Sequence, residues 1–482
     1  MRKFVLLGLG VAGLTLLAGC ASSGLDGLIA QGNAVDTKPL RVDDPEIAGR
    51  KLVTLPRHGT ARGLVGASTL VADGTRGLTA PAPVAPAPQV EPRAGPEAPA
   101  APAGANATLS TAAAGSGPLA TRDNLFDVVS VLWGTDRKIP AAVAAPAATT
   151  SQITTGSVPK TLLPNQERGD TLTLGRALVT IPKVAREKGQ ILRPRQFTFW
   201  NYSLSLSEDP ARHFTLGRFE KLDPFQFGAA ADAVLADARR FEGHAFVYVH
   251  GYNSTFEQAL YRTAQLAHDL EFDGAPFMYS WPSWGSESGY LYDQDSADRA
   301  QKYFLQFLET VATRTKAKKI HIIAHSMGTR PLLDSLKTVA ASARKSRKLK
   351  IDQIVLAAPD IDRDVFVGIA GAIGKVAKGA TLYAMQNDRA LQVSRTVRGV
   401  PRAGDVPPTG PVVVSGVDTI DISDAAAESY FSLNHSNYAE RPHVLADISA
   451  LLRTGQRPPH SRFPAYQATT VEAGTYWKYQ RN

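Results

Sequence analysis

The sequence contains almost no cysteine, because Cys20 is the only one among 482 residues. A single cysteine cannot form an intramolecular disulfide, and it excludes zinc and iron–sulfur sites that need several thiolates. Long apolar runs are also scarce: after the N-terminal segment no stretch reaches the roughly 18 apolar residues of a membrane-spanning helix. Lys and Arg exceed Asp and Glu by only 9, and the basic segment 344–350 contains no interleaved aromatic residue, so the sequence predicts no nucleic-acid partner.

The N-terminal segment has the pattern of a signal peptide. Arg2 and Lys3 precede an apolar run of 14 residues, 4–17, which is too short to span a membrane comfortably. The run ends in Leu-Ala-Gly-Cys at 17–20, which resembles the lipobox of bacterial lipoproteins. That resemblance implies removal of residues 1–19 and acylation of Cys20. An ordinary secretory signal beside a chance cysteine is the alternative.

The residue after Cys20 bears on the membrane to which the chain is sent. It is Ala21 rather than Asp. By resemblance to enterobacterial sorting, this favours a lipid-anchored protein of the bacterial cell envelope, at the outer membrane and facing the periplasm.

A low-complexity linker is predicted between the lipidation site and the folded part. Eight prolines occur between Thr79 and Gly104, mostly in Ala-Pro alternation. Such a segment cannot bury enough apolar surface to offset its ordering entropy. We therefore expect a disordered linker over 20–120, a folded domain over 124–455 and a polar C-terminal tail over 456–482.

Short apolar strands alternate with helical patterns in the folded part. The expected strands are 126–133, 172–181, 197–206, 245–249, 275–281, 319–324, 351–357, 381–385 and 417–422. The expected helices are 255–272, 296–313, 327–340, 365–376, a short one near Ala390, and 442–452. Continuous apolar strands that alternate with helices indicate an α/β fold, in which a mostly parallel sheet carries helices on both faces.

One motif carries nucleophilic chemistry. The apolar strand Ile320–Ile323 runs directly into Ala324-His325-Ser326-Met327-Gly328 and then into a helix. Small residues two before and two after a serine permit a sharp strand-to-helix turn, which exposes the serine Oγ at the edge of the sheet. Ala324 stands where the usual pattern has glycine, and this departure weakens the motif.

A second signal lies upstream, where the strand 245–249 ends in His250-Gly251-Tyr252. In an α/β-hydrolase this turn supplies one N–H group of the oxyanion hole, and the residue after the nucleophile supplies the other. The candidate donors are therefore the backbone N–H groups of Tyr252 and Met327. His250 precedes the nucleophile, so we interpret it as a structural hydrogen-bonding residue rather than the base.

Chain order restricts the base and the acid, since in this fold the acid follows the nucleophile and the histidine comes last. Three histidines follow the serine: His435, His443 and His460. His435 is the preferred base because it lies in a loop between the last predicted strand and the last helix. Asp388, directly after the strand 381–385, is the preferred acid. Asp360 is the alternative, and it could instead cap a helix.

Residues 133 to about 455 resemble a bacterial α/β-hydrolase family of formerly unknown function. The matching pieces are 133–137 (WGTDR), 174–176 (LGR), 179–182 (VTIP), 250–253 (HGYN), 279–283 (YSWPS), 324–328 (AHSMG), 358–360 (APD), 387–388 (ND) and 435–436 (HS). The resemblance implies the α/β-hydrolase fold and a site made of Ser326, Asp388 and His435. It implies no particular substrate.

The sequence therefore predicts a membrane-anchored serine hydrolase of esterase or lipase type. Its substrate would be a carboxylic ester or thioester, such as a lipid, and its mechanism would need neither metal nor organic cofactor. A non-catalytic α/β-hydrolase scaffold that binds envelope components is the alternative, and a peptidase or amidase on the same fold is a third hypothesis.

Three further features remain. The aromatic residues Trp281, Trp284, Tyr290 and Tyr292 would line an acyl pocket, pack in the core or form a lid. The acidic pair in 293–295 is interpreted as a solvated loop with helix capping rather than a metal site. Five basic residues within 344–350 are interpreted as a solvated loop, with contact to anionic lipid or cell-wall polymer as the alternative.

Overall fold

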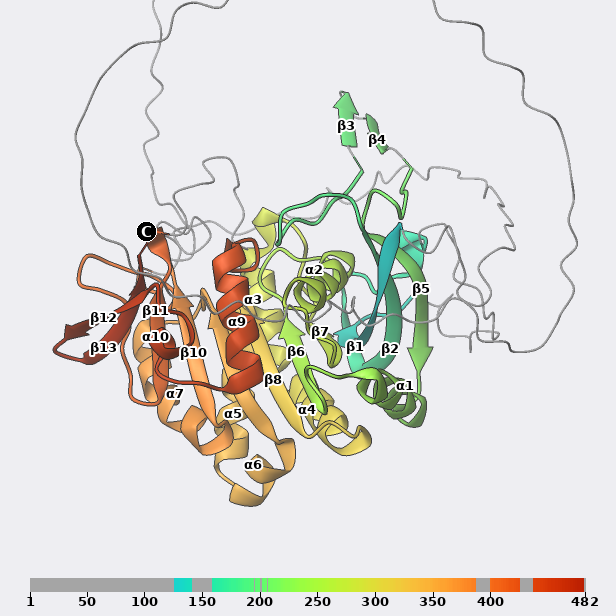
Figure 1. Cartoon of the computed structure of the whole chain (residues 1–482). Helices are drawn as coiled ribbons and strands as arrows, with labels where there is room; N and C mark the ends of the chain where they lie inside the picture. The colour runs from blue at the N-terminus through green and yellow to red at the C-terminus, as the bar shows by residue number, and fades with distance from the viewer. Residues whose placement is uncertain are drawn as a thin grey trace, which may run out of the picture. The chain divides into compact units, whose positions relative to one another are not determined.

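The computed structural model describes residues 125–140, 158–194, 196–199, 202–205, 207–386, 399–424 and 437–480 (Figure 1). Several predicted features lie outside these residues: the signal segment with Cys20, the linker 20–120, the short helix near Ala390, and the site candidates Asp388 and His435. The described residues form the α/β fold that the sequence predicts.

An eleven-stranded sheet organises the described chain, in the order β12-β13-β11-β10-β9-β8-β6-β7-β1-β2-β5. Its strands are β1 (Phe126–Arg137), β2 (Arg168–Pro182), β5 (Thr215–Leu222), β6 (His244–Val249), β7 (Ala275–Ser280), β8 (Lys319–His325), β9 (Ile351–Ala357), β10 (Gly379–Ala384), β11 (Val417–Asp421), β12 (Tyr466–Val471) and β13 (Gly474–Tyr479). All neighbours from β1 to β13 pair in parallel, whereas β1–β2, β2–β5 and β12–β13 pair antiparallel. The predicted mostly parallel sheet is confirmed.

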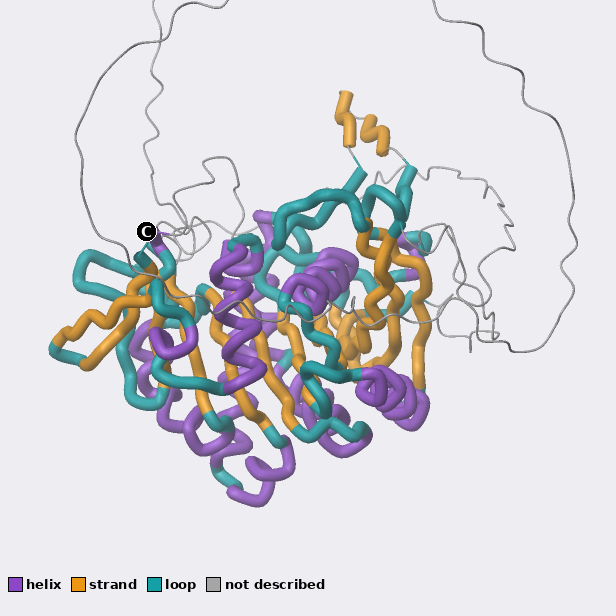
Figure 2. Tube along the Cα trace, in the orientation of Figure 1, coloured by secondary structure: helices purple, strands orange, loops and turns teal. Residues whose placement is uncertain are grey.

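Helices cover both faces of this sheet. One layer contains α1 (Pro224–Asp237), α3 (Tyr290–Arg299), α4 (Gln301–Arg314), α5 (Thr329–Ala340), α6 (Ala343–Leu349) and α7 (Arg363–Val376). The other layer contains α2 (Phe256–Asp269) and α9 (Pro442–Thr454), which lie on the near face in Figure 1. Figure 2 shows the strands running between the two layers.

The strands are apolar on both sides because each side meets a helical layer. In β6, Ala245, Val247 and Val249 join the core under α1 and α3–α7, whereas Phe246 and Tyr248 join the core under α2 and α9. A strand that is buried on both faces shows a continuous apolar run instead of alternation. This pattern made β6, β8 and β9 recognisable in the sequence.

Local capping sets the helix starts. Thr255 and Gln258 form a capping box at the start of α2, and Asp223 and Gln226 form another at α1. Such reciprocal hydrogen bonds satisfy backbone N–H groups that have no partner within the helix. At α7 the cap is Asp362, whose carboxylate accepts from the backbone N–H groups of Asp364 and Val365.

Several elements differ from the sequence-based prediction. The single helix predicted over 296–313 is two helices, α3 and α4, which meet at Ala300, where the Tyr279 hydroxyl donates to the backbone carbonyl (3.2 Å). The segment predicted as one extended strand over 197–206 is a hairpin of β3 (Gln196–Phe199) and β4 (Tyr202–Ser205). The basic segment predicted as a loop forms α6, which is capped by Ser342.

The C-terminal segment, predicted as a separate tail, belongs to the sheet. It forms α10 (Pro459–Arg462) and the hairpin β12–β13, and β13 pairs in parallel with β11. A buried ion pair fastens it, because Arg462 on α10 contacts Asp447 on α9 at 2.7 Å. The hydroxyl of Tyr383 on β10 also donates to this carboxylate. Buried charges need such partners.

The connections around β6 define a switch point in the sheet. From β6 the chain passes through α2 to β7 on one side, and from β7 through α3 and α4 to β8 on the other side. The loops that leave the carboxyl ends of β6 and β8 therefore diverge to opposite faces. In open α/β sheets this arrangement creates the crevice where ligands bind.

Candidate active site

Ser326 occupies a strained turn at the carboxyl end of the central strand β8. The chain leaves β8, passes through one 3-10 turn (Ser326–Gly328) and enters α5. Ser326 has φ +51°, a left-handed conformation that costs a residue with a Cβ atom about 1 kcal/mol or more. Strain of this kind persists only where the surrounding structure imposes it. The expected exposure of this serine is wrong, because Ser326 is buried between the turns that surround it.

Two glycines allow the loops after β6 and β8 to touch. A Cβ atom on Gly328 would lie 2.3 Å from the carbonyl oxygen of His250. A Cβ atom on Gly251 would lie 2.9 Å from the Cβ of Ser326. Both distances are below any normal contact, so the Ser326 turn and the His250–Gly251 turn are packed backbone to backbone. Position 324 does not require glycine, because the methyl group of Ala324 packs in the buried core.

The predicted oxyanion donors belong to these two turns. Met327 is the second residue of the 3-10 turn, and its side chain is buried. Tyr252 follows Gly251, and its hydroxyl donates to the carbonyl of Glu287, which fixes the loop after β6. The Tyr252 ring also packs edge-on against Tyr290, with 5.4 Å between ring centroids. The structure thus brings the Tyr252 and Met327 segments together beside Ser326.

His250 is a buried structural residue, in agreement with its interpretation from the sequence. Its Nδ1 lies 2.9 Å from the carbonyl oxygen of Gly251, and its Nε2 lies 3.0 Å from Ser280 Oγ. The ring stacks on Trp281 with centroids 4.9 Å apart. Burial, together with the nearby Arg137 guanidinium, lowers the pKa of His250 to about 3. A neutral histidine held in this way supports the turn.

Arg137, at the end of β1, is a buried cation behind the turn that the sequence analysis did not assign a role. Its guanidinium donates to the backbone carbonyls of Ser254 (2.8 Å) and Ser283 (3.0 Å) and to Ser280 Oγ (2.9 Å). It therefore connects β1 to the loops after β6 and β7. Burial lowers the pKa of Arg137 to about 10, so the side chain stays charged near neutral pH. The sequence signals were a polar triplet after an apolar strand and the match of 133–137 to the family, neither of which assigned Arg137 a role.

Asp293 completes this support from the other side. One carboxylate oxygen accepts from the Asn253 backbone N–H (3.0 Å) and from Ser283 Oγ (2.6 Å), and the other accepts from the Trp284 backbone N–H (2.5 Å). The prediction of a solvated loop over 293–295 is wrong for this residue, because Asp293 is fully buried in the first turn of α3. Burial raises its pKa, and these donors oppose the rise.

The alternative acid, Asp360, is committed elsewhere. Its carboxylate forms a buried ion pair with Arg402 (2.7 Å) and accepts from the Tyr290 hydroxyl (3.0 Å). The suggested capping role is also wrong for Asp360, since Asp362 caps α7. These contacts leave Asp388 as the preferred acid. It lies two residues beyond Gln386, whose backbone N–H is fixed by Ser423 Oγ (2.8 Å).

The alternative bases are also engaged. His443 stacks on Tyr479 with centroids 4.2 Å apart, beside the C-terminal hairpin. His460 accepts from the Trp477 indole N–H (3.1 Å). Both therefore pack against β13 at the far end of the sheet. His435 lies outside the described residues, but Tyr438, three residues later, packs on His325 with centroids 4.9 Å apart.

The aromatic residues after β7 have different environments. Trp281 is fully buried, and its indole N–H donates to the His250 carbonyl (2.8 Å). Tyr290 is also buried. Trp284 is 46% exposed and packs edge-on against Tyr292. Trp281 and Tyr290 thus belong to the core, and Trp284 and Tyr292 lie at its surface.

Within the described ranges, no group of three or more His, Cys, Asp or Glu side chains is arranged to hold a metal ion. Over the same ranges, no helix has the length and apolar character to cross a bilayer.

Comparison with known proteins finds a similarity over part of the chain. No curated protein matches the chain. Residues 229–454, which run from α1 through Ser326 to the end of α9, match the family described as Alpha/beta hydrolase of unknown function (DUF900).

Proposed function

We propose that the protein is a lipid-anchored serine hydrolase that cleaves carboxylic esters or thioesters through Ser326, His435 and Asp388. The observation that carries the proposal is the left-handed Ser326 turn packed directly against Gly251. Backbone strain costs stability and is retained mainly at functional positions, and the switch point of an open α/β sheet is where ligands bind.

In the first half-reaction, His435 accepts the hydroxyl proton of Ser326 as Oγ attacks the acyl carbonyl. The carbonyl oxygen becomes an alkoxide, which accepts hydrogen bonds from the backbone N–H groups of Tyr252 and Met327. One such donor is worth about 3–4 kcal/mol of barrier. The intermediate then expels the alcohol or thiol, which takes the proton from His435, and an acyl-Ser326 ester remains.

The second half-reaction releases the acyl group. His435 removes a proton from water, the hydroxide oxygen attacks the acyl carbon, and the carboxylic acid leaves as Ser326 regains its proton. Asp388 orients the imidazole and stabilises its protonated form. Side chains and backbone groups of the chain fill all of these roles, so the reaction cycle returns to free enzyme without a cofactor.

Two contacts support His435 and Asp388 as members of the site. Tyr438 packs on His325, the neighbour of Ser326, and three residues of chain reach at most about 11 Å. The length of the chain therefore permits His435 to reach the nucleophile. Asp388 follows β10, two strands from β8, at the same carboxyl edge of the sheet.

The anchoring part of the proposal depends on the sequence at Cys20. Lipid chains on this residue would hold the chain at the membrane, since each buried methylene contributes about 0.8 kcal/mol. Residues 21–124 then lie between the anchor and the domain. The substrate would be an ester within reach of that tether, such as a lipid.

A fluorophosphonate probe tests the catalytic part, because it reacts only with an activated serine. The full-length wild-type protein, extracted in detergent, is expected to be labelled, and Ser326→Ala is expected to lose labelling completely. Ser335→Ala is the matched control, since Ser335 is a buried serine on the next helix. Its labelling should equal that of the wild type.

The same assay discriminates among the partners. His435→Ala should abolish labelling, whereas His443→Ala should retain it. Asp388→Asn should slow it by about 10³–10⁴-fold. If folded wild-type protein is not labelled at all, the hydrolase proposal fails, and a non-catalytic scaffold that binds envelope components takes its place.

A further inference from the structure

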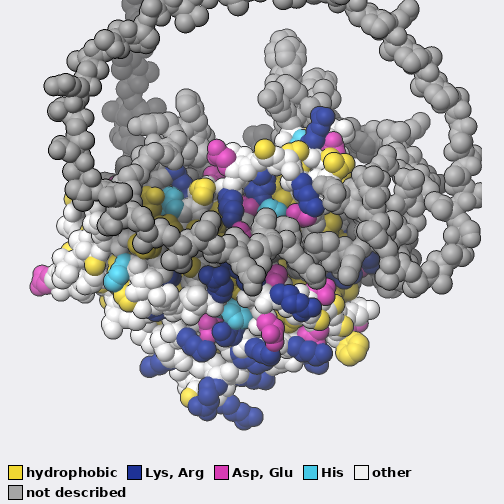
Figure 3. Space-filling view, viewed as in Figure 1, with side chains coloured by type: hydrophobic (Ala, Val, Ile, Leu, Met, Phe, Trp, Pro, Cys, Tyr) yellow, Lys and Arg dark blue, Asp and Glu magenta, His cyan; other side chains and the backbone are white. Residues whose placement is uncertain are grey.

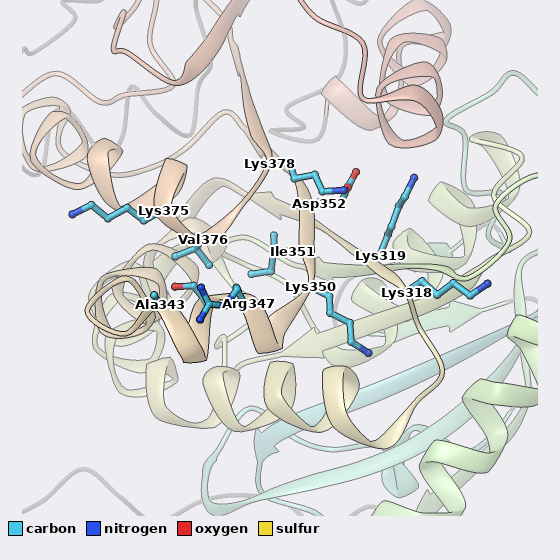
Figure 4. Close-up of a pocket in the computed structure, with 11 residues that line it drawn as sticks. Lys318, Lys319, Ala343, Arg347, Lys350, Ile351, Asp352, Lys375, Val376 and Lys378 are labelled. Atoms are coloured by element: carbon cyan, nitrogen blue, oxygen red, sulfur yellow. The ribbon is translucent and has the colours of Figure 1, made fainter.

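A basic hollow lies at the edge of the sheet opposite to Ser326. It is formed where β8, β9 and β10 begin, between α6 and α7, and has a volume of about 450 Å³ (Figure 4). Its charged lining consists of six cations and one acid: Lys318, Lys319, Arg347, Lys350, Lys375, Lys378 and Asp352. Since β8 has seven residues of about 3.3 Å each, the hollow and Ser326 are about 20 Å apart.

Only part of this positive charge is compensated within the described chain. Asp352 pairs with Lys378 at 2.8 Å, as Figure 4 shows, and Lys318 pairs with Glu242 at 3.3 Å. Lys350 donates to the backbone carbonyl of Ala317. Four cations in the hollow make no ion pair with any described residue: Lys319, Arg347, Lys350 and Lys375.

The surroundings add further cations. Arg344, Lys345 and Lys348 are exposed on α6, directly beside the hollow. Figure 3 shows dark blue Lys and Arg side chains gathered at the end of the molecule where Figure 1 places α6. The hollow is therefore the centre of a larger positive surface.

A buried histidine pair lies beside Asp352, one of the residues that line the hollow. His321 Nε2 lies 3.0 Å from His244 Nδ1, and its Nδ1 lies 4.0 Å from Asp352. Burial holds the pKa of His321 well below its usual range, and His244 and Lys319 lower it further. The histidines do not add to the positive charge, which comes from the Lys and Arg side chains.

We propose that the basic hollow binds phosphate groups. Lys and Arg donate charge-assisted hydrogen bonds to phosphate oxygens, and several cations gathered around one concavity attract an anion more strongly than a single side chain does. Phosphate could be presented by a phospholipid headgroup or by a soluble phosphate compound, and the chemistry of recognition is the same. The hollow lies far from Ser326, so this binding is independent of the hydrolase activity.

Binding is tested with protein that lacks residues 2–19 and carries Cys20→Ser, so that neither the apolar signal segment nor a lipid anchor contributes. One arm measures sedimentation with vesicles of phosphatidylglycerol and phosphatidylcholine in equal parts, against phosphatidylcholine alone. The other arm measures binding of pyrophosphate by calorimetry. The hollow variant combines Lys319→Gln, Arg347→Gln and Lys375→Gln. The matched control removes three distant exposed cations by Lys160→Gln, Lys188→Gln and Arg212→Gln.

Each basic side chain near an anionic surface contributes about a fivefold factor in affinity. The hollow variant should therefore bind the anionic vesicles about 100-fold more weakly, while the control variant changes little. If the hollow variant loses binding to anionic vesicles only, the ligand is a phospholipid headgroup. If it also loses binding to pyrophosphate, the hollow binds soluble phosphate compounds. Absence of binding in both arms, or equal losses in the two variants, overturns the proposal. Thermal unfolding checks that the hollow variant is folded.

Discussion

At the scale of the residue, Ser326 has a backbone conformation that its own chemistry does not favour. A φ of +51° is easy for glycine and costly for any residue with a Cβ atom. The same edge of the sheet holds two more such residues, Asn253 after β6 and Ala358 after β9. Backbone strain is therefore concentrated where the loops of the proposed site leave the strands.

A pair of substitutions separates this strain from the loss of the hydroxyl. Both Ser326→Ala and Ser326→Gly remove the nucleophile and abolish labelling, but only glycine relieves the left-handed backbone. We expect Ser326→Gly to be more stable than Ser326→Ala by roughly 0.5–1 kcal/mol, measured by urea unfolding.

Ser335 supplies the matched pair, because it lies in the regular helix α5. There the order should reverse, with glycine less stable than alanine by about 1 kcal/mol. If glycine is also the less stable residue at 326, the left-handed turn does not exist in solution.

At the scale of the element, loops after two strands are held by one helix. Asp293, in the first turn of α3, accepts hydrogen bonds from the loop after β6 and from the loop after β7. Arg137 of β1 binds the same two loops through their backbone carbonyls. The proposed oxyanion donor at Tyr252 therefore depends on α3 and β1, which are both distant from it in sequence.

Asp293→Asn tests this support. An amide keeps one acceptor oxygen and replaces the other with a donor, which would face a backbone N–H group. We expect a loss of about 1–3 kcal/mol in unfolding free energy and a labelling rate at least tenfold lower. Asp295→Asn, on the exposed face of the same helix, should change neither quantity. An unchanged labelling rate in Asp293→Asn would mean that the loops hold their geometry without it.

The sequence predicted the elements that are buried on both faces. Strands β6, β8 and β9 appear as apolar runs, and their observed ends lie within one residue of the prediction. The edge strands β5 and β12, and β13 next to β12, were missed because their residues are partly exposed and their apolar periodicity is weak. Strand propensity at an edge depends on a partner that the sequence does not reveal.

The sequence identified some residues of the candidate site and missed others, because it does not reveal which charged residues the fold buries. Ser326 is recognisable because a strand, a short motif and a helix are consecutive. Arg137 and Asp293 were not assigned because a charged residue in a sequence usually indicates solvent, and only the fold shows that both are buried. His443 and His460 remained alternatives until the C-terminal hairpin showed what each of them contacts.

At the scale of the whole molecule, two features would bring the chain to a membrane by different physics. The proposed lipid on Cys20 acts through buried methylenes, whose contribution does not depend on salt. The proposed phosphate-binding hollow acts through charge, which is screened within about 3 Å at 1 M ionic strength. If the hollow faces a bilayer, Ser326, about 20 Å away at the other edge of the sheet, faces away from it.

Salt extraction of Cys20→Ser therefore separates the two features. Wild-type protein should stay with the membrane fraction after a wash at about 1 M salt, because lipid chains remain inserted. Protein that carries Cys20→Ser and lacks the apolar segment 2–19, added to the same membranes, should be released by the same wash, yet remain partly bound at low salt through the hollow. Ser22→Ala, two residues from the cysteine, should behave like the wild type. Retention of Cys20→Ser in high salt would contradict the lipid anchor, whereas its release at low salt would remove the hollow as a membrane contact.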